Sequence, residues 1–120
     1  MEEIARLDHV YQYNELMGIE TLHPLVSVID MSKCPRMRHS RRLYGFYCIF
    51  LKDVKCGDLR YGRNYYDYQE GTLVFTAPGQ VVGVEDNGEV FQPKGWALLF
   101  HPDLIRGTSL GRNIGRYTFF

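Results

Sequence analysis

The stretch from Tyr66 to Val81 reads YDYQEGTLVFTAPGQV, and its pattern decides the fold class of the chain. A glycine precedes the β-branched and aromatic run 72–76, and Pro78-Gly79 follows it. β-branched and aromatic residues favour strands, and a Pro-Gly pair marks a turn. This order is typical of a small metal-binding β-barrel, but valine stands at position 82, where such a barrel carries a histidine ligand. The stretch therefore predicts a barrel without its metal ligand.

Segments of the same character surround this stretch. Apolar or alternating runs predict further strands at 25–30, 44–52, 59–62, 64–68, 81–84, 90–91, 95–100 and 116–120. The Asn87-Gly88 pair predicts a hairpin between 81–84 and 90–91. Residues 2–17 place apolar side chains at helical spacing and end before Gly18, so we expect a short N-terminal helix. Many short strands without intervening helices indicate an all-β sandwich or barrel.

The run 44–52 is apolar on both of its faces. Alternation gives one face with Tyr44, Phe46, Cys48 and Phe50, and another with Tyr47, Ile49 and Leu51. A strand that is apolar on both faces has to be covered on both sides. We expect the second sheet of a sandwich on one side, and a helix, a partner or a ligand on the other.

Size and composition limit the function classes. The 120 residues make one domain, residues 1–120, and 45% hydrophobic residues suffice for a single core. Lys plus Arg equals Asp plus Glu at 14 each, so the zero net charge gives no electrostatic reason for nucleic-acid binding by this chain. The three cysteines form no CxxC motif and no apolar signal segment opens the chain, which predicts a reduced, cytoplasmic protein. No apolar run approaches the ~20 residues of a transmembrane helix, so no membrane partner is expected.

Catalytic and metal sites find little support in the sequence. Counting through the barrel frame puts metal ligands near Leu59, 62–64 and Val82, and none of these is His, Asp or Glu. The four histidines are scattered, and no cysteine has a neighbouring histidine to activate it. We therefore expect no metal, no cofactor and no enzymatic activity. The basic segment 33–42 is a candidate contact for DNA phosphates or an anionic effector, but without interleaved aromatic residues a solvated loop is favoured.

Six segments together resemble one known family. They are HPLVSVID at 23–30, YGFYCIFLK at 44–52, CGDLRYGR at 56–63, YDYQEGTLVF at 66–75, APGQ at 77–80 and GWALLFHPDLI at 95–105. Their joint occurrence is similar to the N-terminal domain of AraC/XylS-family transcriptional regulators, and closest to the branch common in Bacteroidetes-type bacteria. The resemblance implies an all-β, cupin-like double-stranded β-helix, or jelly roll, with a short N-terminal α-helix.

The resemblance also implies a function. In this family the N-terminal barrel senses an effector or mediates dimerisation, and a C-terminal domain of two helix-turn-helix units binds DNA. That DNA-binding half is expected after Phe120 and is absent from this chain, which would regulate transcription without itself binding DNA. The expected partners are a small-molecule effector, such as a sugar or another metabolite, and a second copy in a homodimer. DNA would be contacted only through the missing domain.

The predicted effector pocket consists of barrel-facing aromatic residues, with an arginine to anchor an anionic group of the effector. The candidates are Phe46, Tyr61, Tyr66 and Trp96 for the pocket, and Arg60 or Arg63 for the anchor. Effector binding would shift the population between two arrangements of the barrel and its N-terminal segment. Two alternatives stay open: a small metal-dependent cupin enzyme, and a protein-interaction module whose barrel is filled by its own side chains.

Overall fold

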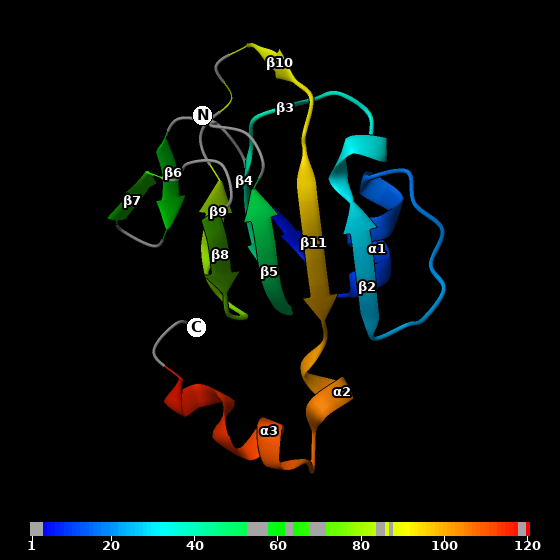
Figure 1. The fold of residues 1–120 in the computed structure, drawn as a ribbon, viewed down its shortest axis with the longest axis vertical. Coiled ribbons are helices and arrows are strands. Elements are labelled where there is room, and N and C mark those ends of the chain that lie inside the picture. The colour runs from blue at the N-terminus through cyan, green and yellow to red at the C-terminus, as the bar shows by residue number, and fades with distance from the viewer. Residues whose placement is uncertain are drawn as a thin grey trace.

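The chain folds into short β-strands, with helices near its two ends (Figure 1). The computed structural model describes residues 4–52, 58–61, 64–67, 72–83, 86, 88–117 and 120, and of residues 52, 58–61, 64–67 and 72 it describes the backbone alone. The strands are β1 (Ala5–Leu7), β2 (Val26–Asp30), β3 (Met37–Arg38), β4 (Arg41–Tyr44), β5 (Tyr47–Lys52), β6 (Asp58–Tyr61), β7 (Asn64–Asp67), β8 (Thr72–Thr76), β9 (Val81–Gly83), β10 (Val90–Phe91) and β11 (Gly95–Phe100). The helices are α1 (Val10–Leu16), α2 (Pro102–Ile105) and α3 (Ser109–Asn113), with the 3-10 turns η1 (Met31–Lys33) and η2 (Ile114–Arg116).

Most strands belong to two sheets. One sheet has the order β1-β4-β9-β6-β7, the other has the order β2-β11-β5-β8, and β10 and β3 form a separate ribbon (Figure 1). From β2 onward the chain passes repeatedly between the two sheets, because β4, β6, β7 and β9 belong to the first and β5, β8 and β11 to the second. The described pairs are antiparallel except for β1 with β4, which is parallel. Strand neighbours are therefore mostly distant in sequence, and among the described residues neither sheet closes on itself.

The main core lies between the two sheets and is completed by α1. Its buried side chains come from both sheets and from the helix. The inward positions of β5, β8 and β11 are Cys48, Phe50, Val74, Thr76, Ala97 and Leu99. Helix α1 and the residue after it add Val10, Tyr13 and Met17, which recur every three or four residues and so share one face. Of the two apolar faces predicted for 44–52, the one with Tyr44, Phe46, Cys48 and Phe50 is therefore the one that lies in the core.

A second, smaller apolar cluster covers one end of the outer face of the four-stranded sheet. Its buried members are Phe100, Ile105 and Ile114. The rings of Tyr47 and Phe100 stack with centroids 5.0 Å apart, and Phe120 meets Tyr47 edge-on at 5.2 Å. The chain's own C-terminal segment therefore covers part of the second apolar face of β5.

The N-terminal helix is shorter than predicted. The residues of β1 pair in parallel with β4 instead, and the helix begins only at Val10. The side chain of Gln12 accepts hydrogen bonds from the backbone N–H groups of Asp8 and His9, each at 2.8 Å. Because these bonds satisfy amides at the helix entry, they fix the start of α1 directly after the strand.

The predicted hairpin between 81–84 and 90–91 is wrong. Strand β9 pairs with β4, and β10 pairs with β3. Arg38 donates from Nε to Oδ1 of Asp86 at 3.0 Å, and its Nη2 lies 2.8 Å from Oδ2. The same Oδ1 accepts the backbone N–H of Gly88 at 2.8 Å. These contacts connect Asp86 and Gly88 to β3.

The run 44–52 is divided between two strands, although it was predicted as one. Strand β4 ends at Tyr44, and β5, in the other sheet, begins at Tyr47. A Cβ at Gly45 would lie 3.1 Å from backbone atoms of Asp8. The glycine thus lets the N-terminal segment pass close to the chain where it crosses from one sheet to the other.

The C-terminal region and the basic segment also differ from the prediction. Arg116 belongs to η2, so no strand begins there, and residues 118–119 of the predicted strand 116–120 lie outside the described residues. Helices α2 and α3, which were not predicted, occupy the region before η2. The basic segment 33–42 contributes to η1, β3 and β4, so much of it is regular structure and not a solvated loop.

Candidate functional site

The structure separates the two predicted pocket aromatics whose side chains it describes. Phe46 is fully buried in the main core. Trp96 lies on the outer face of the four-stranded sheet, where it is 49% exposed. The two residues therefore do not line a common pocket, and their contact with an effector stays a prediction.

The other predicted contacts lie in or beside β6 and β7. Arg60 and Tyr61 belong to β6 and Tyr66 to β7, where the backbone is described, and Arg63 lies outside the described residues. The register makes Tyr61 the Cα partner of Val82, which is buried in β9. The backbone thus brings β6 to the edge of the core, and the roles of these four side chains stay predictions.

Three aromatic rings, one from α1, one from the end of β4 and one from the link between β4 and β5, meet in the core. Tyr13 meets Tyr44 edge-on with ring centroids 5.7 Å apart, and it meets Phe46 at 6.4 Å. Tyr44 and Phe46 stack at 5.1 Å. The next helical residue, Asn14, is also buried, and its Oδ1 accepts a hydrogen bond from Oγ of Ser27 at 2.8 Å. Helix α1 is therefore attached both to the aromatic cluster and to the edge strand β2.

Burial controls the ionisation of the two phenols in this cluster. It raises the pKa of Tyr13 well above its usual value of 10.0, and it raises the pKa of Tyr44 to about 12. The positive charge of Arg42 acts in the opposite direction on both pKa values but does not offset burial. Both hydroxyl groups are therefore neutral at physiological pH, where they act as hydrogen-bonding groups without charge.

Thr76 brings an unsatisfied polar group into the core. The residue is fully buried in β8, directly opposite Cys48 of β5. Among the described residues its Oγ1 has no hydrogen-bond partner. An unpaired buried hydroxyl costs about 1–3 kcal/mol, so this group is a candidate anchor for a polar atom of a bound molecule. Sequence reasoning missed Thr76, although its spacing from Val74 places both residues on one face of the strand.

Metal-ligating residues do not gather in the described part of the chain. There, no group of three or more His, Cys, Asp or Glu side chains lies close enough to hold a metal ion. Of the expected ligand positions, Val82 is buried in β9, Leu59 lies in β6, Asn64 begins β7, and 62–63 lie outside the described residues. Two of the scattered histidines do meet, since the rings of His9 and His101 stack with centroids 5.7 Å apart.

Comparisons of the sequence with family models and with curated proteins gave no match. Within the described residues, no helix is both long enough and apolar enough to cross a membrane.

The buried phenols predict a loss of stability at alkaline pH. Below pH 10.0 both the folded and the unfolded chain keep these hydroxyl groups protonated. Above it the unfolded chain loses the protons, whereas the folded chain keeps them until the pH passes the raised pKa values, about 12 for Tyr44. The free energy of unfolding should therefore fall as the pH rises from 10.0 toward 12.

Urea unfolding at several pH values across this range measures how steeply the free energy of unfolding falls with pH, which is the slope used below. Tyr44→Phe and Tyr13→Phe should each flatten it, because each removes a proton that only the folded chain retains. Tyr11→Phe removes an exposed phenol from the same helix as Tyr13 and is the matched control. An equal change of slope in all three variants would show that the slope does not come from the buried phenols.

Proposed function

We propose that the chain is a regulatory domain of the AraC/XylS type, in which a cupin-like jelly roll senses a small-molecule effector, mediates dimerisation, or does both. The strand order carries this proposal. Eight of the described strands remain when β1, β3 and β10 are set aside. In a double-stranded β-helix the first, eighth, third and sixth strands form one sheet, and the second, seventh, fourth and fifth form the other. The orders β2-β11-β5-β8 and β4-β9-β6-β7 agree with this scheme.

This order discriminates well among β-folds. Strands that follow one another in sequence are neighbours in most sheets, as in meanders and hairpins. Here the first of the eight strands, β2, pairs with the last, β11, and β5 pairs with β8 across the intervening hairpin of β6 and β7. A sandwich built from successive hairpins does not produce these pairs, so they support a jelly roll.

The described interior suits an organic effector. It contains the rings of Tyr13, Tyr44 and Phe46, of which the two tyrosines carry neutral phenol hydroxyls, and the hydroxyl of Thr76, which has no partner among the described residues. An effector that enters this interior would stack a flat apolar face on the rings and bond its hydroxyl groups to the polar ones, and sugars and small aromatic metabolites offer both features. The arginine anchor expected at position 60 or 63 would add recognition of an anionic group.

Helix α1 offers a route from the effector to the surface. Tyr13 of α1 packs in the aromatic cluster, and Asn14 of α1 hydrogen-bonds to Ser27 of β2. The helix is therefore in contact with both the interior and the edge strand. An effector that reaches the rings would bind one position of α1 better than another. It would then shift the population of the two positions by its difference in affinity.

A melting-temperature screen of sugars, sugar acids and aromatic metabolites tests effector sensing. A compound that binds only the folded chain should raise the melting temperature. Thr76→Val should raise the stability of the free protein by about 1 kcal/mol, because it removes a buried hydroxyl without a partner. If that hydroxyl anchors the effector, the same variant should reduce the effector-dependent rise in melting temperature.

Thr108→Val is the matched control for this variant. It makes the same atomic change at a hydroxyl that accepts the N–H of Gly111 at 3.1 Å and caps α3. It should lower the stability of the free protein and leave the response to the effector unchanged. Two results would overturn effector sensing. If no compound in the panel stabilises the protein, the interaction module is favoured. If the purified protein contains a bound transition metal, the metal-dependent enzyme is favoured.

A further inference from the structure

An arginine belongs to the inward face of the sheet β1-β4-β9-β6-β7. Arg42 stands two positions before the buried Tyr44 in β4, so the two residues share one face of the strand. The Cα partner of Arg42 in β9 is Val82, which is also buried, and its partner in β1 is Ala5, which is exposed. Arg42 itself is half-buried. It therefore lies at the border of the main core, where a molecule from solvent can reach its guanidinium group.

The guanidinium group of Arg42 lies beside the hydroxyl groups of the aromatic cluster. Burial raises the pKa values of both Tyr13 and Tyr44, and the nearby positive charge of Arg42 acts against burial on each. The guanidinium group also lies within hydrogen-bonding reach of the Tyr44 hydroxyl. A hydroxyl that accepts from a guanidinium group keeps its own proton free to donate elsewhere. One cation and two neutral hydroxyl groups are thus gathered at the edge of the stacked rings.

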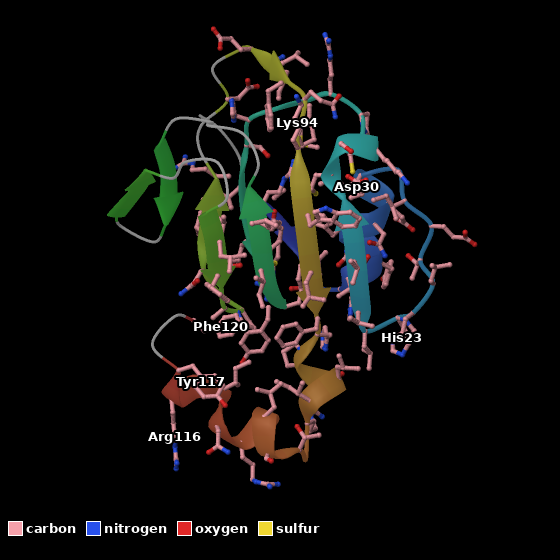
Figure 2. The ribbon with its side chains drawn as sticks, viewed as in Figure 1. His23, Asp30, Lys94, Arg116, Tyr117 and Phe120 are labelled. Carbon is pink, nitrogen blue, oxygen red and sulfur yellow. The ribbon has the colours of Figure 1, made fainter. Side chains whose placement is uncertain are left out.

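Among the described residues, no carboxylate forms an ion pair with Arg42. Other described arginines have such a partner, namely Arg6 with Asp8, Arg38 with Asp86 and Arg106 with Asp103. The carboxylate of Asp30, at the end of β2 (Figure 2), accepts hydrogen bonds from the backbone N–H and the hydroxyl of Ser32. A positive charge beside a buried cluster costs free energy unless an anion accompanies it. Arg42 therefore gains from a bound anion.

We propose that Arg42 binds the carboxylate of the effector, and that the effector is therefore a small organic acid. The planar fork of a guanidinium group matches the two oxygens of a carboxylate. The hydroxyl groups of Tyr13 and Tyr44 donate to the same oxygens, and the rings beside them stack on the flat part of the acid. This inference rests on the proposed function, because it names the chemical class of the effector.

The balance of charge favours a carboxylate over a phosphate or an uncharged sugar. A carboxylate brings one negative charge, which matches the one positive charge of Arg42, whereas a phosphate monoester carries about −1.5 to −2. Arg41, the preceding residue of β4, belongs to the opposite face of the strand. An uncharged sugar would leave the charge of Arg42 without a counterion. Arg42 is also the last residue of the basic segment 33–42, which the sequence marks as a candidate contact for an anionic effector.

Acids and their neutral analogues test this inference on the intact chain. Benzoate or galacturonate should raise the melting temperature more than benzamide or galactose, which lack the charge. Arg42→Gln should raise the dissociation constant of the stabilising acid about tenfold to hundredfold, because it removes a hydrogen bond to a charged group. Arg42→Lys keeps the charge but loses the planar fork, so it should raise the dissociation constant by a smaller factor. Titration calorimetry measures these constants.

Arg41→Gln is the matched control, because it removes the same charge from the neighbouring position on the other face of β4. It should leave the dissociation constant of the acid unchanged. An acid that binds both Arg42 variants as tightly as the natural chain, or equal losses in the Arg41 and Arg42 variants, would overturn the proposal. If only neutral compounds stabilise the chain, the acid is ruled out and effector sensing stands. If no compound stabilises it, both proposals fail.

Discussion

Gly83→Ala should lower the free energy of unfolding by about 3 kcal/mol or more, a large effect for one added methyl group. Gly83 ends β9 with a backbone φ of 106°, where residues with a side chain are strained. A Cβ there would lie 2.1 Å from the carbonyl oxygen of Ser40. Because this oxygen belongs to the backbone, the clash is relieved only if β9 moves away from β4, where Arg41 is the Cα partner of Gly83.

Gly79→Ala separates the backbone strain at a positive φ from the steric clash with Ser40, the two causes of this loss. Gly79 also has a positive φ, 88°, but nothing lies within 4 Å of the place that a Cβ would take. Its replacement should therefore cost only the backbone strain, about 1–2 kcal/mol. Urea unfolding of the two variants measures the difference. Equal losses would show that the contact with Ser40 relaxes without cost.

The same region shows how far local pattern predicts this fold. Strands β8 and β11 have the boundaries that their apolar runs predict, because Pro78-Gly79 ends one run and His101-Pro102 ends the other. The position of β9 was also predicted to within a residue. Its partner was not, because the Asn-Gly turn favours a local hairpin, whereas the structure pairs β9 with residues 41–43, about forty positions earlier. Pairing over that distance leaves no local pattern in the sequence.

Local sequence pattern was also insufficient to predict helices α2 and α3 and to place the start of α1. Helices α2 and α3 have four and five residues, too few to display the repeat of an amphipathic helix. Their caps were the available signal: the Nδ1 of His101 accepts the N–H of Asp103 at 3.1 Å, and Thr108 caps α3. At the other end of the chain, 5–7 fit a helical pattern but pair with β4, because tertiary pairing overrides local propensity.

The candidate site was predicted less well because several strands are apolar on both faces. In β5 and β11 alternation separates two apolar sets but does not say which set points inward. Phe46 proved to be buried, while Trp96 belongs to the outward set and lies half-exposed on the outer face of the four-stranded sheet. Thr76 was missed for the opposite reason, since a polar residue at a strand end suggests a boundary and not a buried hydroxyl.

Phe46→Ala should lower the free energy of unfolding by about 3–5 kcal/mol, a large part of the stability of a domain of this size. The side chain is fully buried, and its ring contacts the rings of Tyr13 and Tyr44. Truncation would leave a cavity between α1 and the strands. Trp96→Ala removes a larger ring but should cost much less, because about half of that residue is already in water. Urea unfolding of both variants measures the contrast, and equal losses would contradict the position of Phe46 in the core.

A milder change at the same position decides whether Phe46 also contacts an effector. Phe46→Leu keeps an apolar side chain in the core and should cost about 1–2 kcal/mol, so the protein stays folded for binding measurements. If Phe46 only fills the core, the variant melts at a lower temperature, but a stabilising compound raises that temperature as much as in the natural chain. If the ring stacks on the effector, the rise itself shrinks. The melting temperature without compound reports packing, and its increase with compound reports binding. One titration therefore separates the contribution of Phe46 to the core from its contact with an effector.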